Sequence, residues 1–219
     1  MMSNKDYYEE CWNDKKHFGK FAGEEYESPE WWTEENLEWH YSYFSKYIGK
    51  HILDIGAGEG TFLNFLAQKT SKIETMIGAE LSDSAIAMAN KKYPKLQLQQ
   101  EFVENLSFAD NSFDTVFCLE VVEHLLDVDR ALQEIHRVLK PGGYFCVTTT
   151  DFNLPKKIIL AVLFWEKYFY PNQPIIRVFT KSTLRDICAK HKLEFVNYKW
   201  NKSHFGLMPK GQMAVFRKV

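Results

Sequence analysis

Three glycines at alternate positions, Gly56, Gly58 and Gly60, have a spacing that predicts ligand binding. They follow an apolar run, His51–Ile55, and precede a segment typical of a helix. A ligand can lie against bare backbone at such a turn, because glycine has no Cβ and tolerates a positive φ. The helix that follows offers unpaired N–H groups in its first turn. We therefore expect a ligand at this turn.

Glu80 is an acidic side chain whose position completes this pattern. It lies twenty residues beyond Gly60 and ends a second apolar run, Thr75–Ala79. A carboxylate in this place can accept hydrogen bonds from both hydroxyls of a ribose. The alternative is an exposed carboxylate at a strand end that binds nothing. Together with the glycine turn, Glu80 predicts a nucleoside-type cofactor at the carboxyl ends of a parallel sheet.

The choice of cofactor depends on the glycine spacing and on Asp54. Dinucleotide enzymes prefer G-x-G-x-x-G, whose third glycine would fall at Thr61 in this chain. Asp54 stands two residues before Gly56, where an acid suits a cofactor with an ammonium group better than one with a pyrophosphate. S-adenosylmethionine carries an ammonium and a sulfonium, so it is the cofactor that we predict. On the turn alone, a simple link between strand and helix stays the alternative.

A second reactive group, Glu120, Glu123 and His124, follows the fourth predicted strand, at the sheet edge where ligands bind. If the segment is helical, positions i, i+3 and i+4 share one face. We predict that all three residues line the acceptor side of the site, with His124 as a candidate general base. A divalent ion such as Mg²⁺ or Mn²⁺ on the same residues is one alternative, although a fourth ligand cannot be assigned. Capping and packing roles are the other alternative.

The elements that must position these residues alternate between strands and helices, which is typical of a doubly wound α/β sheet. Strands are predicted near 51–55, 75–80, 96–101, 114–119, 143–150, 193–200 and 211–217. Helices are predicted over 34–47, 60–69, 83–92, 128–139, 155–169 and 180–191. The last two strands have only a short link, so we expect them to pair antiparallel.

Two regions lie outside the alternating pattern. Residues 1–47 are predicted to form an aromatic-rich helical cap, and residues 48–219 to form the cofactor-binding core. Within the core, the apolar insert 151–180 is a candidate lid or dimer contact, with the helix 156–170 joining two copies of the chain. Its uncharged run, Ile158–Trp165, is too short to span a bilayer.

Two more motifs, 110–124 (DNSFDTVFCLEVVEH) and 137–145 (RVLKPGGYF), follow the glycine turn in order. With them the chain resembles the class I S-adenosylmethionine-dependent methyltransferases from about His51 to Thr150. The resemblance implies a seven-stranded Rossmann-like sheet of order 3-2-1-4-5-7-6, with strand 7 antiparallel. Trp31-Trp32 and the stretch 120–125 are similar to small-molecule O-methyltransferases of the ubiquinone-biosynthesis type. The stretch is also similar to one that holds a metal in small-RNA 2′-O-methyltransferases.

The resemblance extends the set of cofactor-binding residues. Phe102 stands at the position where the family places an acid that meets the adenine. Glu101 or Glu104 could supply that contact instead, or Phe102 could pack on the ring while the Val103 N–H donates. The predicted cofactor-binding set is Asp54, Gly56, Ala57, Gly58, Gly60, Glu80, Leu81, Glu101, Phe102, Val103 and Leu119.

Composition narrows the function further. Lys+Arg 27 against Asp+Glu 29 gives a net charge of −2, which does not favour a nucleic-acid partner. The chain start has no apolar stretch typical of a signal peptide, so a cytoplasmic protein is expected. We predict an enzyme that transfers a methyl group to a small molecule at a hydroxyl. Its rivals are an RNA- or protein-end methyltransferase and a non-catalytic, cofactor-binding partner subunit.

Overall fold

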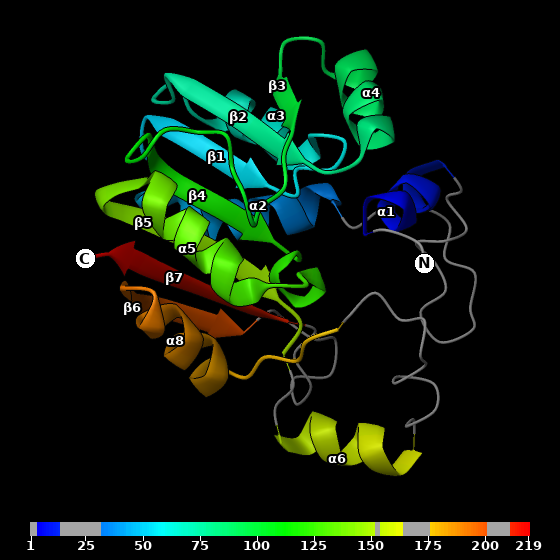
Figure 1. The fold of residues 1–219 in the computed structure, drawn as a ribbon, viewed down its shortest axis with the longest axis vertical. Helices are drawn as coiled ribbons and strands as arrows, with labels where there is room; N and C mark the ends of the chain where they lie inside the picture. Colours follow the sequence, from blue (N-terminus) through cyan, green and yellow to red (C-terminus); the bar gives the residue numbers. More distant parts are fainter. Residues whose placement is uncertain (1–3, 14–31, 152–153, 164–175, 201–210) are drawn as a thin grey trace.

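A single seven-stranded sheet forms the centre of the molecule (Figure 1). The computed structural model describes residues 4–13, 32–151, 154–163, 176–200 and 211–219. The strand order is β3-β2-β1-β4-β5-β7-β6, and β7 runs antiparallel to both of its neighbours, which confirms the predicted topology. The strands are β1 (His51–Ile55), β2 (Thr75–Glu80), β3 (Gln97–Gln100), β4 (Phe113–Leu119), β5 (Leu139–Thr149), β6 (Leu193–Trp200) and β7 (Gln212–Lys218).

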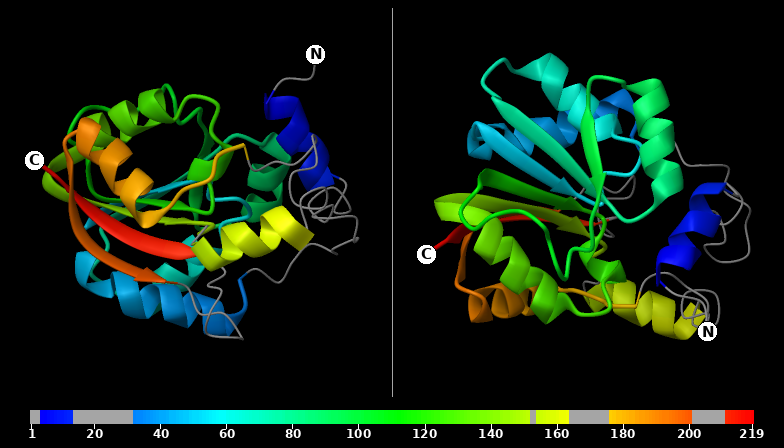
Figure 2. Two further views of the ribbon diagram at one scale, coloured as in Figure 1. Left: turned by 90° about the horizontal axis from the view of Figure 1, so that it is seen from below. Right: turned by 45° about the horizontal axis from the view of Figure 1, so that its top comes forward.

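Helices cover both faces of this sheet (Figure 2). The described α-helices are α1 (Asn4–Asn13), α2 (Glu34–Phe44), α3 (Thr61–Lys69), α4 (Asp83–Lys92), α5 (Val128–Val138), α6 (Leu154–Leu163) and α8 (Lys181–Lys190), with 3₁₀ turns η1 (Ser45–Tyr47) and η2 (Val122–His124). One apolar cluster joins α5 and α8 to the sheet, and a second joins α2 and α3 to its other face. Both layers pack on β1 and β4, which places these two strands in the core.

Capping residues explain where two of the helices begin. Thr33 lies in extended backbone and its side chain accepts a hydrogen bond from Asn36 N at 3.2 Å, so it is the N-cap of α2. Ser82 does the same for α4 through Ala85 N, also at 3.2 Å. Since Ser82 follows β2 almost directly, the start of α4 lies at the carboxyl edge of the sheet.

Some predicted elements differ from the structure. β5 begins at Leu139, not near 143, because the chain enters the sheet as soon as α5 ends. Of the helix predicted over 155–169, the structure describes α6, Leu154–Leu163. Several predicted segments lie outside the described residues. They are 164–170 of the predicted dimer helix, 152–153 and 164–175 of the insert, and 1–3 and 14–31 of the cap, which include Trp31. The dimer contact and the boundary at residue 47 stay predictions.

None of the described helices has the length and apolarity needed to cross a bilayer. The cytoplasmic location stays a prediction.

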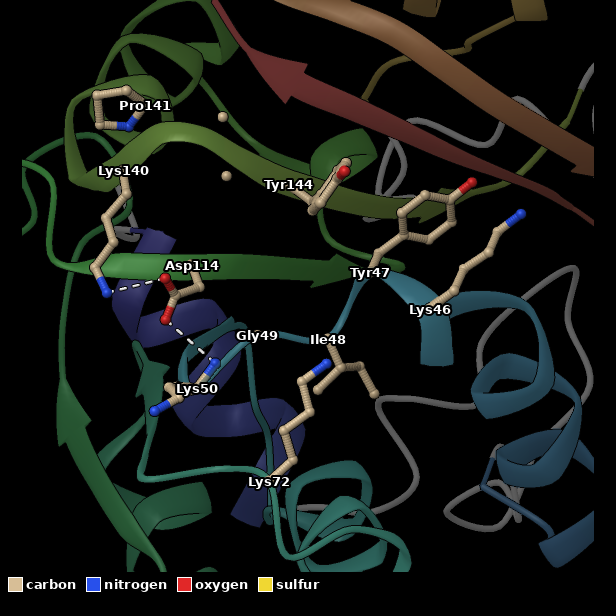
Figure 3. Close-up of a pocket in the computed structure, with 12 residues that line it drawn as sticks. Lys46, Tyr47, Ile48, Gly49, Lys50, Lys72, Asp114, Lys140, Pro141 and Tyr144 are labelled. Atoms are coloured by element: carbon tan, nitrogen blue, oxygen red, sulfur yellow. Dashed lines mark hydrogen bonds and ion pairs between the residues drawn. The ribbon is translucent and has the colours of Figure 1, made fainter.

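At the amino edge of the sheet, Asp114 joins the chain entering β1 to β4 and β5 (Figure 3). Its carboxylate accepts hydrogen bonds from His51 N at 2.8 Å and Lys50 N at 3.2 Å, and pairs with Lys140 Nζ at 2.9 Å. It borders a hollow of about 380 Å³ lined mainly by lysines and by the rings of Tyr47 and Tyr144. The glycine turn lies at the other end of the strands, so this hollow is separate from the predicted cofactor site.

Candidate cofactor and acceptor site

The glycine turn after β1 adopts a backbone that side chains rarely tolerate. Gly56, Gly58 and Gly60 have φ values of 69°, 54° and 79°. A Cβ on Gly56 would lie 2.3 Å from Val121 Cγ2, so any larger residue would displace the segment after β4. Gly56 N and Ala57 N donate to Ala79 O at 2.8 and 3.2 Å, which fixes the turn to the end of β2.

Glu80 is held beside this turn by backbone donors. Its carboxylate accepts hydrogen bonds from Gly58 N and Leu81 N at 2.8 Å and from Ser82 N at 3.0 Å. The side chain is only 7% exposed, and burial raises its pKa although these three donors act in the opposite direction. One carboxylate can accept about four hydrogen bonds, so Glu80 keeps capacity for the hydroxyl groups of a ligand.

Asp54 gives the turn a second buried acid. It is 4% exposed, and burial together with the nearby Glu80 carboxylate raises its pKa well above the ordinary value. Among the described residues no lysine, arginine or histidine forms an ion pair with either acid. Two neighbouring buried carboxyls without a cation are costly unless a positive ligand group joins them. The site therefore fits a cofactor that carries an ammonium and a ribose.

Helix α1 lies beside the carboxyl edge of the sheet and contacts the turn (Figure 2). The ring of Trp12 would lie 3.1 Å from a Cβ on Gly58, so it packs directly on the turn. Glu9 accepts hydrogen bonds from Ser82 Oγ at 3.1 Å and Ser84 N at 3.2 Å, at the exposed N-terminus of α4. The ion pair of Lys5 with Asp83, at 2.7 Å, adds to the same contact. These bonds hold α1 over the predicted cofactor site.

On the adenine side, Glu101 already has partners. It accepts hydrogen bonds from Ser107 N at 3.0 Å and from Gln99 Nε2 at 2.9 Å, and also from the Ser107 hydroxyl. Phe102 beside it is 50% exposed, whereas Val103 is buried in the core. Of the predicted contacts, packing of the Phe102 ring on a base therefore needs the least rearrangement.

The segment after β4 is not the helix that the spacing of Glu120, Glu123 and His124 suggested. Glu120 has a φ of 56°, and its N–H donates to Thr148 O at 3.1 Å, which ties it to β5. Only Val122–His124 form a single 3₁₀ turn. The expectation of one helical face is therefore wrong, because a left-handed residue interrupts the geometry that i, i+3 and i+4 require.

Glu120 and Glu123 nevertheless lie together. Burial and the adjacent Glu123 carboxylate raise the pKa of Glu120 to about 8, and burial also raises the pKa of Glu123, so the two carboxyls titrate as a pair. The Glu120 residue is partly exposed to solvent, whereas its carboxyl group is buried among protein atoms. The ring of His124 meets that of Tyr8 edge-on, with centroids 6.4 Å apart. No three metal-binding side chains converge in the described part of the chain.

A family model described as a methyltransferase domain matches residues 53–147, the stretch from β1 to β5 that carries the turn and both acids. Residues 53–147 of this chain therefore match a methyltransferase domain. A demethylmenaquinone methyltransferase from Chlorobaculum parvum is 34% identical over 134 residues, 60% of this chain and 53% of that protein. A ubiquinone biosynthesis O-methyltransferase from Alkalilimnicola ehrlichii is 31% identical over 120 residues, 52% of this chain and 47% of that protein.

Solved methyltransferases share the fold. A Thermotoga maritima S-adenosylmethionine-dependent methyltransferase, described as a possible histamine N-methyltransferase, superposes with a TM-score of 0.66 at 23% identity. The superposition covers 84% of this chain and 89% of that one. By sequence, however, this chain spans about half the length of the curated relatives that it matches.

Several residues of this site were missed from the sequence. From α1, which precedes the first strand by some forty residues, Trp12 packs on the glycine turn, Glu9 binds the start of α4 and Tyr8 meets His124. Their aromatic and acidic composition indicated a cap, but no spacing signal linked Glu9 to the start of α4. Thr149 and Gln212, which lie beside Glu123, belong to strand patterns and gave no signal at all.

Proposed function

We propose that this protein transfers the methyl group of S-adenosylmethionine to a hydroxyl oxygen of a small molecule. The observation that carries the proposal is the pair of buried acids, Asp54 and Glu80, at a turn in which three glycines have a positive φ. When bound, the cofactor supplies a methyl group already activated by a sulfonium, which leaves a neutral thioether after transfer.

The protein's own residues bind and orient. Asp54 would face the cofactor's ammonium, Glu80 would accept from its ribose hydroxyls, and the turn would let both groups approach the backbone. Trp12 and Tyr8 of α1 exclude water from the same edge. Since the methyl group is already activated, the rate depends mainly on holding donor and acceptor in line.

The acceptor's proton must leave as the new bond to carbon forms. The imidazole of His124 takes the hydroxyl proton, and the neighbouring Glu120–Glu123 pair stabilises the imidazolium that results. The carbon–sulfur bond breaks, the carbon–oxygen bond forms, and the proton stays on His124 until solvent removes it. We propose this route without a metal ion, because an imidazole beside a carboxyl pair suffices to accept one proton.

Similarity to enzymes of quinone biosynthesis supports a small acceptor, although the activities in their names belong to those proteins. The net charge of −2 argues against an RNA substrate. A non-catalytic binding subunit would retain Asp54 and Glu80 but would release no product.

Calorimetry and product release test the proposal. S-adenosylmethionine and its demethylated product should bind in the micromolar range and NAD should not. Tighter binding of NAD would overturn the assignment of S-adenosylmethionine as the cofactor.

His124→Ala should lower kcat by about 10²-fold or more with little change in cofactor affinity. EDTA should leave the rate unchanged. Loss with EDTA and recovery with Mg²⁺ or Mn²⁺ would instead assign a metal to Glu120, Glu123 and His124.

A further inference from the structure

Three buried side chains lie at one edge of the sheet, in the turn after β4, at the end of β5 and at the start of β7. Among the described residues, Oε2 of Glu123, Oγ1 of Thr149 and Oε1 of Gln212 have no hydrogen-bond partner, and the three residues are 1%, 0% and 1% exposed. Most buried polar side-chain atoms in proteins have a partner, so each exception calls for an explanation. Strand pairing brings these three exceptions together.

Strand pairing and short contacts bring these atoms into one cluster. Thr149 of β5 lies directly opposite Gln212 of β7. Thr150 N donates to Glu123 Oε1 at 3.3 Å, and Gln212 Nε2 donates to Thr150 O at the same distance. The Thr149 hydroxyl lies near enough to lower the pKa of Glu123, but the two atoms do not meet hydrogen-bond geometry.

The chemistry of the cluster is one-sided. Gln212 Nε2 donates to Phe179 O at 3.0 Å as well as to Thr150 O, which fixes the amide with its oxygen free. Thr150 N donates to Oε1 of Glu123, which leaves Oε2 without a donor among the described residues. Of the three side chains, only Thr149 has a free group that can donate. The three unpartnered atoms therefore offer more acceptors than donors.

The cluster also lies close to the predicted transfer site. Glu123 belongs to η2 together with His124, whose ring meets Tyr8. Burial raises the pKa of Tyr8, and the Glu80 and Glu123 carboxyls both add to this rise. The side chain of Tyr8 therefore lies between the cofactor side and the cluster. A molecule that presents its reacting oxygen near His124 could place a second group among Glu123, Thr149 and Gln212.

We propose that Glu123, Thr149 and Gln212 form a subsite that binds a second hydrogen-bond donor of the acceptor, a hydroxyl or an amino group that is not itself methylated. The acceptor class is then a small molecule with two donor groups, of which one reacts and the other anchors. The subsite itself follows from the three side chains. That its ligand is the methyl acceptor rests on the proposed function.

Thr149→Val gives a sharp test because Oγ1 of Thr149 makes no hydrogen bond within the protein. The change keeps the shape of the side chain, so the fold should be retained. Thr149→Ser keeps the hydroxyl and serves as the matched control. Binding of phenol, catechol and 2-aminophenol is measured by calorimetry on protein saturated with S-adenosylhomocysteine. The three probes carry one hydroxyl, two hydroxyls, and a hydroxyl with an amine.

The wild type should bind one or both two-donor probes about tenfold more tightly than phenol. Thr149→Val should bring that probe close to the affinity of phenol, and Thr149→Ser should keep the preference. Preference for catechol assigns a hydroxyl anchor, and preference for 2-aminophenol an amino anchor. No two-donor preference in the wild type, or an equal preference in Thr149→Val, overturns the subsite and assigns the cluster to internal water. If S-adenosylhomocysteine does not bind, the proposed function fails, and the probe series on the unsaturated protein still decides the subsite.

Discussion

The two ends of the parallel strands each hold an aspartate, and the two side chains have opposite surroundings. Asp114 at the amino edge has a lysine and two backbone N–H groups as partners, and Lys140 among them holds its pKa below the ordinary value despite partial burial. Asp54 at the carboxyl edge has no cationic partner in the described residues, and burial raises its pKa. Because Asp114 has its partners within the protein, we expect it to stabilise the fold. Because Asp54 lacks a cationic partner among the described residues, we expect it to stabilise the complex with the cofactor.

The largest expected effect is on Asp54. Asp54→Asn should weaken S-adenosylmethionine binding by about 1.5–3 kcal/mol, because a charged hydrogen-bond partner of the ammonium is lost. The same change should raise the free energy of unfolding of the cofactor-free protein, since it removes a buried unpaired charge. Calorimetry and urea unfolding measure the two quantities. Lower stability with unchanged affinity would place Asp54 in the same class as Asp114.

Asp114→Asn should show the reverse pattern. The amide cannot pair with Lys140 or accept equally well from His51 N, so stability should fall by about 1–2 kcal/mol. Cofactor affinity should not change, because Asp114 lies at the other edge of the sheet. A loss of affinity comparable to that of Asp54→Asn would contradict the division between the two edges.

The pH dependence of stability extends the comparison to Glu120. Its folded pKa of about 8 lies above its unfolded value, so the folded state binds more protons between these values. Stability of the cofactor-free protein should therefore fall as pH rises from about 4.5 to 8. Asp114 acts with the opposite sign, since its contribution is present above about pH 4 and lost as pH falls through its lowered pKa.

Glu120→Gln isolates this effect. Thermal melting at pH 5 and pH 8 should show a smaller difference in the variant than in the wild type. A slope that is the same in both proteins would assign the pH dependence to other groups, such as Asp54.

The smallest expected effect is on the contact of α1 with α4. Glu9→Ala removes the acceptor for Ser84 N and should cost about 0.5–1 kcal/mol of stability. Dissociation of the cofactor should become faster, because α1 is less firmly held over Gly58. Stopped-flow measurement of the off-rate checks this, with Glu10→Ala on the same helix as the control. Equal off-rates in both variants would remove α1 from control of cofactor release.

Local signals account for what could be predicted. The glycine turn, Glu80 and the strand order depend on turn chemistry and alternating patterns, which are visible in short stretches. The spacing of Glu120 and His124 suggested a shared helical face, and this expectation was wrong. A positive φ at a glutamate, such as that of Glu120, has no sequence signature. Contacts such as Glu9 with Ser82, or Thr149 with Gln212, join segments more than sixty residues apart, and neither residue type indicates its partner.

The absent side chain of Gly56 has a consequence for the order of events. Val121 fills the space where a Cβ would lie, so the turn that receives the cofactor packs on the residue between Glu120 and η2. Displacement of the turn would displace the acceptor side as well. Loading with cofactor should therefore set the acceptor groups in place first, and the two substrates should bind in a compulsory sequence. Product inhibition patterns in steady-state kinetics would record that sequence.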